Sequence, residues 1–340
     1  MVDSSKPSAS AQKPASKVAK PPVAPAPFDS VDAGADIILR TSDKAEFYVH
    51  KFLLSFASPF FKDMFSLPQA TSVASRIPVI DITEDAQTFN LILRICYPFS
   101  SPPLTNMTDV RRVFEAALKY DIPAVQDVAE VGLATITEKE PLGIFVIGCR
   151  TNREDICRSA AISLLQHPLQ SLECDELHDL SAYDYHKLTR WHARCCAAAS
   201  GAVFGRDWFE NGDVSAQNNA RCSCWIKDPA AGSEWLAPKG LWEYLGRVRE
   251  TLAACPSSAA VASEQLLGPK DRWNCGRGSC AGKDCQKGRR EFVEILGREV
   301  DRLVSEVKIL RRSCHLLSFC LYSFIIPDSS SKVLCLSEQK

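Results

Sequence analysis

Three stretches near the N-terminus decide the fold: Asp36–Arg40 (DIILR), Glu46–Val49 (EFYV) and Ser58–Phe65 (SPFFKDMF). The first two are rich in β-branched and aromatic residues, and the segment Thr41–Ala45 between them is short enough for a hairpin. The third opens with Ser-Pro, which favours a helix start, because serine can cap the first turn and proline has no N–H to lose there. The sequence therefore predicts a β-hairpin followed by a helix.

The pattern continues downstream with one more strand and several helices. The run Ile77–Ile82 predicts a third strand, in which Pro78 stands at a sheet edge or at the strand's start. Thr83 with Glu84 and Asp85 is expected to open a helix, whose body from Phe89 to Tyr97 is apolar nearly all round and so should be deeply buried. Two further amphipathic helices are predicted around 110–118 and 123–136. These elements make an α/β (α+β) domain with a three-stranded sheet and clustered helices.

Composition changes divide the chain into six parts. Residues 1–27 hold six prolines and no aromatic residue, which predicts a disordered arm. Next come the compact domain (28–138), a helical extension (139–190), an irregular, loop-rich region rich in Cys and Trp (191–285), an amphipathic helix (286–312) and a poorly ordered tail (313–340). The apolar seam of the amphipathic helix runs for about two and a half heptads, which favours docking onto its own domain over self-association.

Composition also excludes several classes of protein. The chain has 340 residues, 46% of them hydrophobic, and a net charge of −1, which argues against binding nucleic acid by bulk charge. No apolar run reaches the roughly 20 residues that span a bilayer, and no hydrophobic run near the N-terminus marks a secretory signal. We therefore expect a protein of the cytoplasm or nucleus, with no membrane contact, whose 15 cysteines are thiols or metal ligands rather than disulfides.

The segment from Asp36 to Phe65, with the strand and helix order above, strongly resembles the BTB/POZ domain over residues 28 to about 138. It looks most like the branch found in basidiomycete fungi, where Leu93–Pro98 also has a counterpart, and residues 141–164 are similar to the helical extension of those proteins. The residues that carry the resemblance are Asp36, Val49, His50, Lys51, Leu54, Ser58, Phe60, Phe61, Met64 and Phe65.

The resemblance implies a protein–protein interaction module, commonly a homodimer and sometimes a substrate adaptor of cullin ubiquitin ligases. It also places Asp36 near the dimer interface. From its position at the start of a strand, Asp36 is expected to be a partly buried, paired carboxylate, and Phe89 and Tyr97 are expected at a partner-binding surface. Cullin-binding relatives carry a glutamate two residues after the position of Phe89, where this chain has Leu91, so cullin recruitment is the weaker expectation. Lys44 replaces the glycine usual in the first hairpin turn, which should slightly weaken that turn.

The Cys-rich region raises two further alternatives. Cys222, Cys224, Cys275, Cys280 and Cys285 could hold a structural zinc ion, yet the region has no Cys-x-x-Cys pair and no nearby histidine, so ordinary thiols are favoured and no cofactor is expected. Residues 270–290 hold seven Lys or Arg against two Asp. A transcriptional regulator that contacts nucleic acid there is conceivable, but a solvated loop is favoured.

No catalytic constellation appears in the sequence: there is no Gly-x-Ser-x-Gly, no His-Glu-x-x-His and no phosphate loop. His50 is expected to form a structural hydrogen bond at the strand-to-helix corner rather than to act as a base or ligand. The sequence as a whole predicts a non-enzymatic adaptor that acts through protein partners and pairs with itself.

Overall fold

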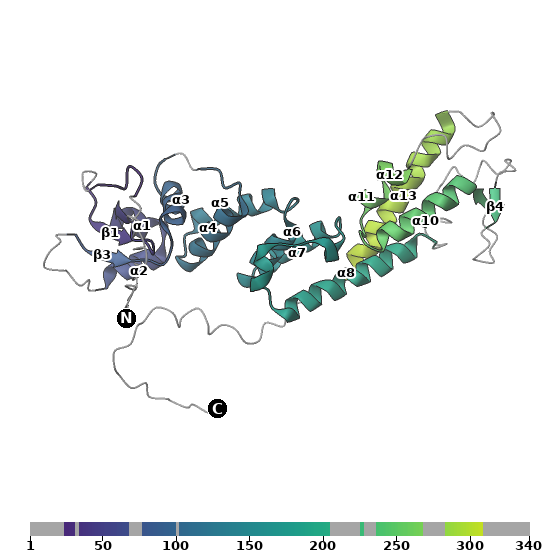
Figure 1. The fold of residues 1–340 in the computed structure, drawn as a ribbon. Coiled ribbons are helices and arrows are strands. Elements are labelled where there is room, and N and C mark those ends of the chain that lie inside the picture. Colours follow the sequence, from purple (N-terminus) through teal and green to yellow (C-terminus); the bar gives the residue numbers. More distant parts are fainter. Residues whose placement is uncertain are drawn as a thin grey trace, which may run out of the picture.

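The computed structural model describes residues 24–30, 34–67, 77–99, 102–204, 225–227, 236–267 and 283–308. These residues form an elongated molecule (Figure 1). A domain that contains a small sheet lies at one end, a lobe of longer helices lies at the other, and a pair of short helices lies between them. The predicted tail 313–340 and most of the predicted arm lie outside the described residues.

The sheet has three strands in the order β2-β1-β3. β1 (Ile37–Arg40) pairs antiparallel with β2 (Glu46–Val49) and parallel with β3 (Val79–Asp81). Pro78 precedes β3, and its carbonyl accepts a hydrogen bond of 2.9 Å from the amide of Ile38. The missing N–H of proline therefore costs no bond to β1, and the expectation that Pro78 stands at the start of an edge strand is confirmed.

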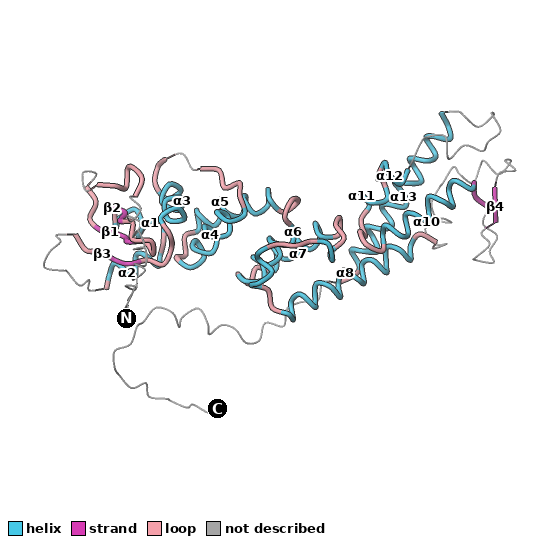
Figure 2. Tube along the Cα trace, viewed as in Figure 1, coloured by secondary structure: helices cyan, strands magenta, loops and turns pink. Residues whose placement is uncertain are grey.

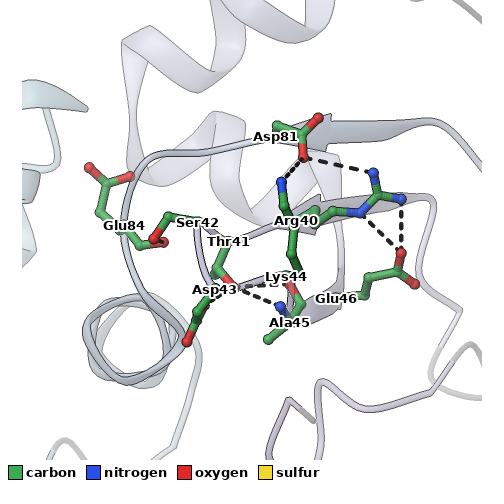
Figure 3. A network of polar contacts seen from close by, with 9 residues as sticks. All are labelled: Arg40, Thr41, Ser42, Asp43, Lys44, Ala45, Glu46, Asp81 and Glu84. Carbon is green, nitrogen blue, oxygen red and sulfur yellow. Dashed lines mark hydrogen bonds and ion pairs between the residues drawn. The ribbon is translucent and has the colours of Figure 1, made fainter. Parts of the chain in front are cut away.

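The turn between β1 and β2 is a compact polar network (Figure 3). The buried Thr41 hydroxyl accepts from the amide of Ala45 (3.0 Å) and donates to Asp43 (2.5 Å). Asp43 in turn accepts from the amide of Ala86 (3.1 Å), and the carbonyl of Glu84 accepts from the amide of Ser42 (2.9 Å). The turn thus joins the hairpin to the start of the helix that follows β3.

Lys44 has a φ of +72° in this turn, the left-handed region that a glycine would occupy without strain. Its ammonium lies 3.9 Å from Asp81 in an exposed ion pair, which contributes little. We therefore expect Lys44→Gly to raise the free energy of unfolding by about 1 kcal/mol in chemical denaturation. The matched control is Lys62→Gly on an exposed helix, which should lower it by about 1 kcal/mol. If both variants had a lower free energy of unfolding than the wild type, the backbone at Lys44 would not be strained.

Five helices complete this domain: α1 (Lys51–Ala57), α2 (Pro59–Ser66), α3 (Ala86–Cys96), α4 (Met107–Lys119) and α5 (Pro123–Ile136). α1, α2 and α3 lie beside the sheet, and α4 and α5 pack against each other and against α3 on the side away from the strands (Figure 2). As predicted, Ser58 caps α2, with its hydroxyl accepting from the amide of Phe61, and Pro59 is the first helical residue. The predicted start of α3 at Thr83 was two residues early, because the carboxylate of Asp85 caps that helix by accepting from the amide of Thr88 (2.8 Å). The fold is thus the expected three-stranded sheet with clustered helices.

The end of the predicted disordered arm packs on this domain. Ala24 and Phe28 are buried, and the carbonyl of Ala26 accepts from the guanidinium of Arg94 (3.0 Å). The carbonyl of Phe28 also accepts from the amide of Tyr48 (2.9 Å), on the outer edge of β2. Residues 24–27, which were predicted to belong to the disordered arm, are therefore packed on the domain.

A helical extension follows, made of α6 (Pro141–Arg150), α7 (Glu154–Leu164) and the short 3-10 turns η2 (Leu169–Ser171) and η3 (Asp175–Asp179). Ion pairs hold it against the first domain. The guanidinium of Arg150 lies 3.1 Å from Glu115 on α4 and also pairs with Asp179, and Arg153 lies 2.5 Å from Glu130 on α5. The first domain and the extension are therefore tied at several points.

In the parts of residues 191–285 that the structure describes, the far lobe is mainly helical, where the sequence predicted an irregular region. α8 (Ala182–Ala202) crosses the predicted boundary at residue 190, and it is followed by β4 (Trp225–Lys227), β5 (Leu236–Pro238), α10 (Lys239–Leu252), α11 (Ser258–Val261), α12 (Glu264–Leu267) and α13 (Lys283–Glu306). Trp191, Cys195 and Ala199 are buried at a spacing of four residues on α8. Cysteine behaves here as a small apolar residue. Counting Cys195 as apolar gives the spacing of a helix with one buried face, which the predicted irregular region did not include.

The predicted amphipathic helix is α13, and it docks within this lobe. Val293, Leu296 and Val300 of its predicted seam are buried, and the indole N–H of Trp191 on α8 donates to the carbonyl of Val307 (3.1 Å). Leu303 follows Leu296 at the heptad spacing but is only half-buried, and the neighbouring Val304 is buried, because a straight helix drifts away from a heptad repeat. The structure confirms docking of this helix onto its own lobe.

Candidate protein-interaction surface

The corner between β2 and α1 is fixed by two polar contacts. The phenol oxygen of Tyr97 accepts from the amide of His50 (2.9 Å) and lies 3.1 Å from His50 Nδ1. The carboxylate of Asp36 accepts from the amide of Lys51, the first residue of α1 (2.8 Å). An anion at this end also interacts favourably with the helix dipole. Asp36 and His50 therefore orient α1 on the sheet.

The structure gives both residues structural roles, with one correction. His50 forms the expected hydrogen bond at the strand-to-helix corner. Asp36 was expected to be partly buried, but it is exposed, because its partner is a backbone amide at the open end of a helix. Burial raises the pKa of Tyr97 to about 12, against the opposing effect of its hydrogen bond from His50, so the phenol stays protonated at neutral pH.

α1 buries one side and exposes the other. Leu54 is fully buried, and Leu53 and Ala57 pack against the core. Phe52 and Phe56, one helical turn apart on the opposite side, are 77% and 87% exposed. We call these two side chains the α1 aromatic face. Two exposed phenyl rings on one short helix are an apolar surface without a covering element in the described chain.

The remaining residues of the predicted motif build the core below this face. Ser58 and Phe61 are fully buried, and the Phe61 ring stacks on Tyr120 with 5.0 Å between centroids. The motif residues that are fully buried are Val49, Leu54, Ser58 and Phe61, and those partly buried against the core are Phe60, Met64 and Phe65. These residues therefore support the surface rather than form it.

Phe89 and Tyr97 do not lie at a partner-binding surface. Phe89 is 0% exposed and meets Phe47 edge-on at 5.4 Å, and Tyr97 is 7% exposed and meets Phe28 edge-on at 5.1 Å. The physical reason is that Phe89 lies on the buried face of α3, with Thr88, Ile92 and Leu93, whereas Gln87 is exposed. The predicted deep burial therefore holds for one face of this helix and not all round it. The prediction of a partner contact at these two residues is wrong for the folded domain.

The α1 aromatic face was not among the surfaces expected from the sequence. Phe52-Leu53-Leu54-Ser55-Phe56 places apolar residues on every side of a seven-residue helix that can bury only one side. This excess of apolar side chains is the signal that could have identified Phe52 and Phe56.

The predicted zinc ligands are beyond what the structure describes. Cys222, Cys224, Cys275 and Cys280 lie outside the described residues, and Cys285 lies on α13 in a part whose side chains are not described. Within the described ranges, no group of three or more His, Cys, Asp or Glu side chains is arranged to hold a metal ion. None of the helices in the described ranges has the length and hydropathy needed to cross a membrane.

Comparison with known proteins gives a family for the first domain. Residues 29–137 match the model of the BTB/POZ domain. The chain is 22% identical to the human Kelch repeat and BTB domain-containing protein 8 over 175 residues, which cover 46% of this chain and 28% of that protein. The mouse and rat proteins of the same name are 22% identical over the same length. The aligned region thus spans less than a third of the length of these relatives.

Proposed function

We propose that this chain, whose residues 29–137 form a BTB/POZ domain, is a non-enzymatic adaptor that pairs with a second copy of itself through the α1 aromatic face. The BTB/POZ domain is a protein-interaction module. The observation that carries the proposal is the exposure of Phe52 and Phe56 on a helix whose start is fixed by Asp36 and His50. Aromatic side chains are enriched at the centres of protein interfaces.

The charge of α1 supports a second copy as the occupant. Lys51, at its N-terminal end, is the one charged residue of the helix. A twofold axis brings the same patch of two subunits together, so a charged patch would repel itself. If two copies of α1 cross near Phe56 in antiparallel fashion, the two Lys51 side chains stay at opposite ends. The face is therefore compatible with self-pairing.

Light scattering on the full chain tests this proposal. We expect the wild-type chain to have the mass of a dimer and the double variant Phe52→Gln/Phe56→Gln to have that of a monomer, because losing two central aromatic contacts weakens association by tenfold or more, about 1.4 kcal/mol at least. Asp36→Lys, which removes the anion at the start of α1, should weaken the dimer in the same direction.

The matched control is Tyr183→Gln, which removes an aromatic side chain that is similarly exposed but lies on α8. Its mass should stay that of the wild type. A monomeric wild-type chain, or a double variant that remains a dimer, would refute the pairing. Circular dichroism on each variant establishes that the fold is kept.

A second candidate is binding of nucleic acid through the basic Cys-rich segment. It is supported by seven Lys or Arg against two Asp over residues 270–290. A shift of duplex DNA that weakens with salt and is lost in Arg289→Ala/Arg290→Ala would favour it. If the chain does not shift duplex DNA, the nucleic-acid candidate is refuted and the adaptor role is the one that remains.

Four finer assignments belong to the proposal as well: the branch of the family, the place of action, cullin recruitment and structural zinc. The first assignment is the basidiomycete fungal branch of the family, whose members have a counterpart of Leu93–Pro98. The second is a place of action inside the cell, in the cytoplasm or nucleus. Cullin recruitment is the weaker possibility because of Leu91, and co-purification with a cullin is the observation that would support it. Structural zinc in the Cys-rich region would be detected by metal analysis of the purified chain.

A further inference from the structure

Two thiols meet at the hairpin between α6 and α7. Cys149 lies one residue before the end of α6, Cys157 lies in the first turns of α7, and their Sγ atoms are 3.8 Å apart. This separation is van der Waals contact for two sulfur atoms, and a disulfide bond would shorten it to about 2.05 Å. A change of this size is within reach of side-chain rotation.

The backbone of the hairpin brings these thiols together. The amide of Arg153 donates to the carbonyl of Gly148 (2.9 Å), and Asn152 between them takes a φ of +57°. A Cβ atom on Gly148 would come within 2.8 Å of both the amide nitrogen and the Sγ of Cys157. Glycine therefore permits an approach of the two helices that other residues would prevent, and the thiols are held in place by the turn itself.

We propose that Cys149 and Cys157 are a redox-modification site that forms a reversible disulfide when a hydroperoxide oxidises it. The Cys157 thiolate attacks one peroxide oxygen, so that an S–O bond forms, the O–O bond breaks and an alcohol or water leaves. The Cys149 thiolate then attacks the sulfur of this sulfenic acid, an S–S bond forms, and the hydroxide leaves as water. The two thiols lose two electrons in total, and the peroxide gains them.

Burial assigns the order of the two steps. Cys149 is 8% exposed, whereas Cys157 is half-buried and therefore easier for a peroxide to reach. Cys157 is the attacking thiol and Cys149 the resolving one. The disulfide connects α6 to α7 across a short loop. We therefore expect it to raise the midpoint temperature of thermal unfolding of the helical extension by about 5 °C.

Peptide mapping of the full chain tests the proposal directly. Trypsin cuts after Lys139, Arg150, Arg153 and Arg158, so the two cysteines fall in separate peptides, 140–150 and 154–158. After treatment with hydrogen peroxide, alkylation and digestion without reductant, we expect these peptides to appear joined, and dithiothreitol to separate them. Joining of peptide 154–158 to a different cysteine peptide, or oxidation of Cys157 to the sulfinic acid without joining, would overturn the proposal.

A pair of variants distinguishes the two roles. In Cys149→Ser, the sulfenic acid on Cys157 has no resolving thiol, so we expect dimedone to label peptide 154–158 after peroxide treatment. The matched control is Cys174→Ser, which removes a partly buried thiol elsewhere in the extension and should leave the joined peptides unchanged. A joined product lost equally in both variants would contradict the assignment.

Discussion

Phe89→Ala is expected to lower the free energy of unfolding of the BTB/POZ domain by about 3–5 kcal/mol. The Phe89 side chain is fully buried on α3 and packs edge-on against Phe47, so its removal leaves a cavity at the junction of sheet and helix. Chemical denaturation followed by circular dichroism measures this loss. The size of the effect would make Phe89→Ala one of the most destabilising single changes in the domain.

Phe52→Ala is the matched control, because it removes the same side chain from an exposed position on α1. Its effect on unfolding should stay within about 0.5 kcal/mol, while association of the chain weakens. The two variants thus separate a core phenylalanine from a surface one. If Phe89→Ala kept its stability and lost association instead, the burial described above would be wrong and the original partner-binding role would be right.

Ser58→Ala is expected to cost about 2–4 kcal/mol of stability, from a lost helix cap and a buried carbonyl left without its donor. The fully buried Ser58 hydroxyl donates to the carbonyl of Tyr120 (2.5 Å) and accepts from the amide of Phe61 (3.0 Å). One atom therefore serves both the start of α2 and the end of α4. Chemical denaturation measures the loss.

Ser181→Ala removes a cap of the same kind in an exposed setting, since the Ser181 hydroxyl accepts from the amide of Asp184 at the start of α8. Water can replace that bond, so a cost of about 1 kcal/mol is expected there. Equal losses in the two variants would show that the contact of Ser58 with Tyr120 contributes nothing beyond capping.

Local chemistry in the sequence was enough to predict much of the first domain. Ser58 and Pro59 mark the start of α2, and Pro78 marks the start of an edge strand, because each residue acts on its own neighbouring backbone groups. The predicted hairpin also formed with its strained Lys44. These features depend on contacts within a few residues, which a single sequence displays directly.

The features that depend on distant contacts could not be predicted in the same way. Whether Phe52 or Phe89 faces water depends on which side of its helix the sheet covers, and both lie in apolar runs. The hydrogen bond from the Trp191 indole to the carbonyl of Val307 joins residues far apart in the chain, and no local sequence pattern predicts it. The burial of Cys195 and Cys196 on α8 could not be predicted for the same reason, since it depends on the surrounding lobe.

The length of α8 has a consequence for how a paired molecule would engage a target. A helix of 21 residues is about 30 Å long, and it packs against α10 and α13 as part of the far lobe. The helical extension lies between this lobe and α1 (Figure 1), so two copies joined at α1 would carry two separated lobes. A target with two matching sites could then be held by both lobes at once, and weak individual contacts would give avidity gains of about 10²–10⁴.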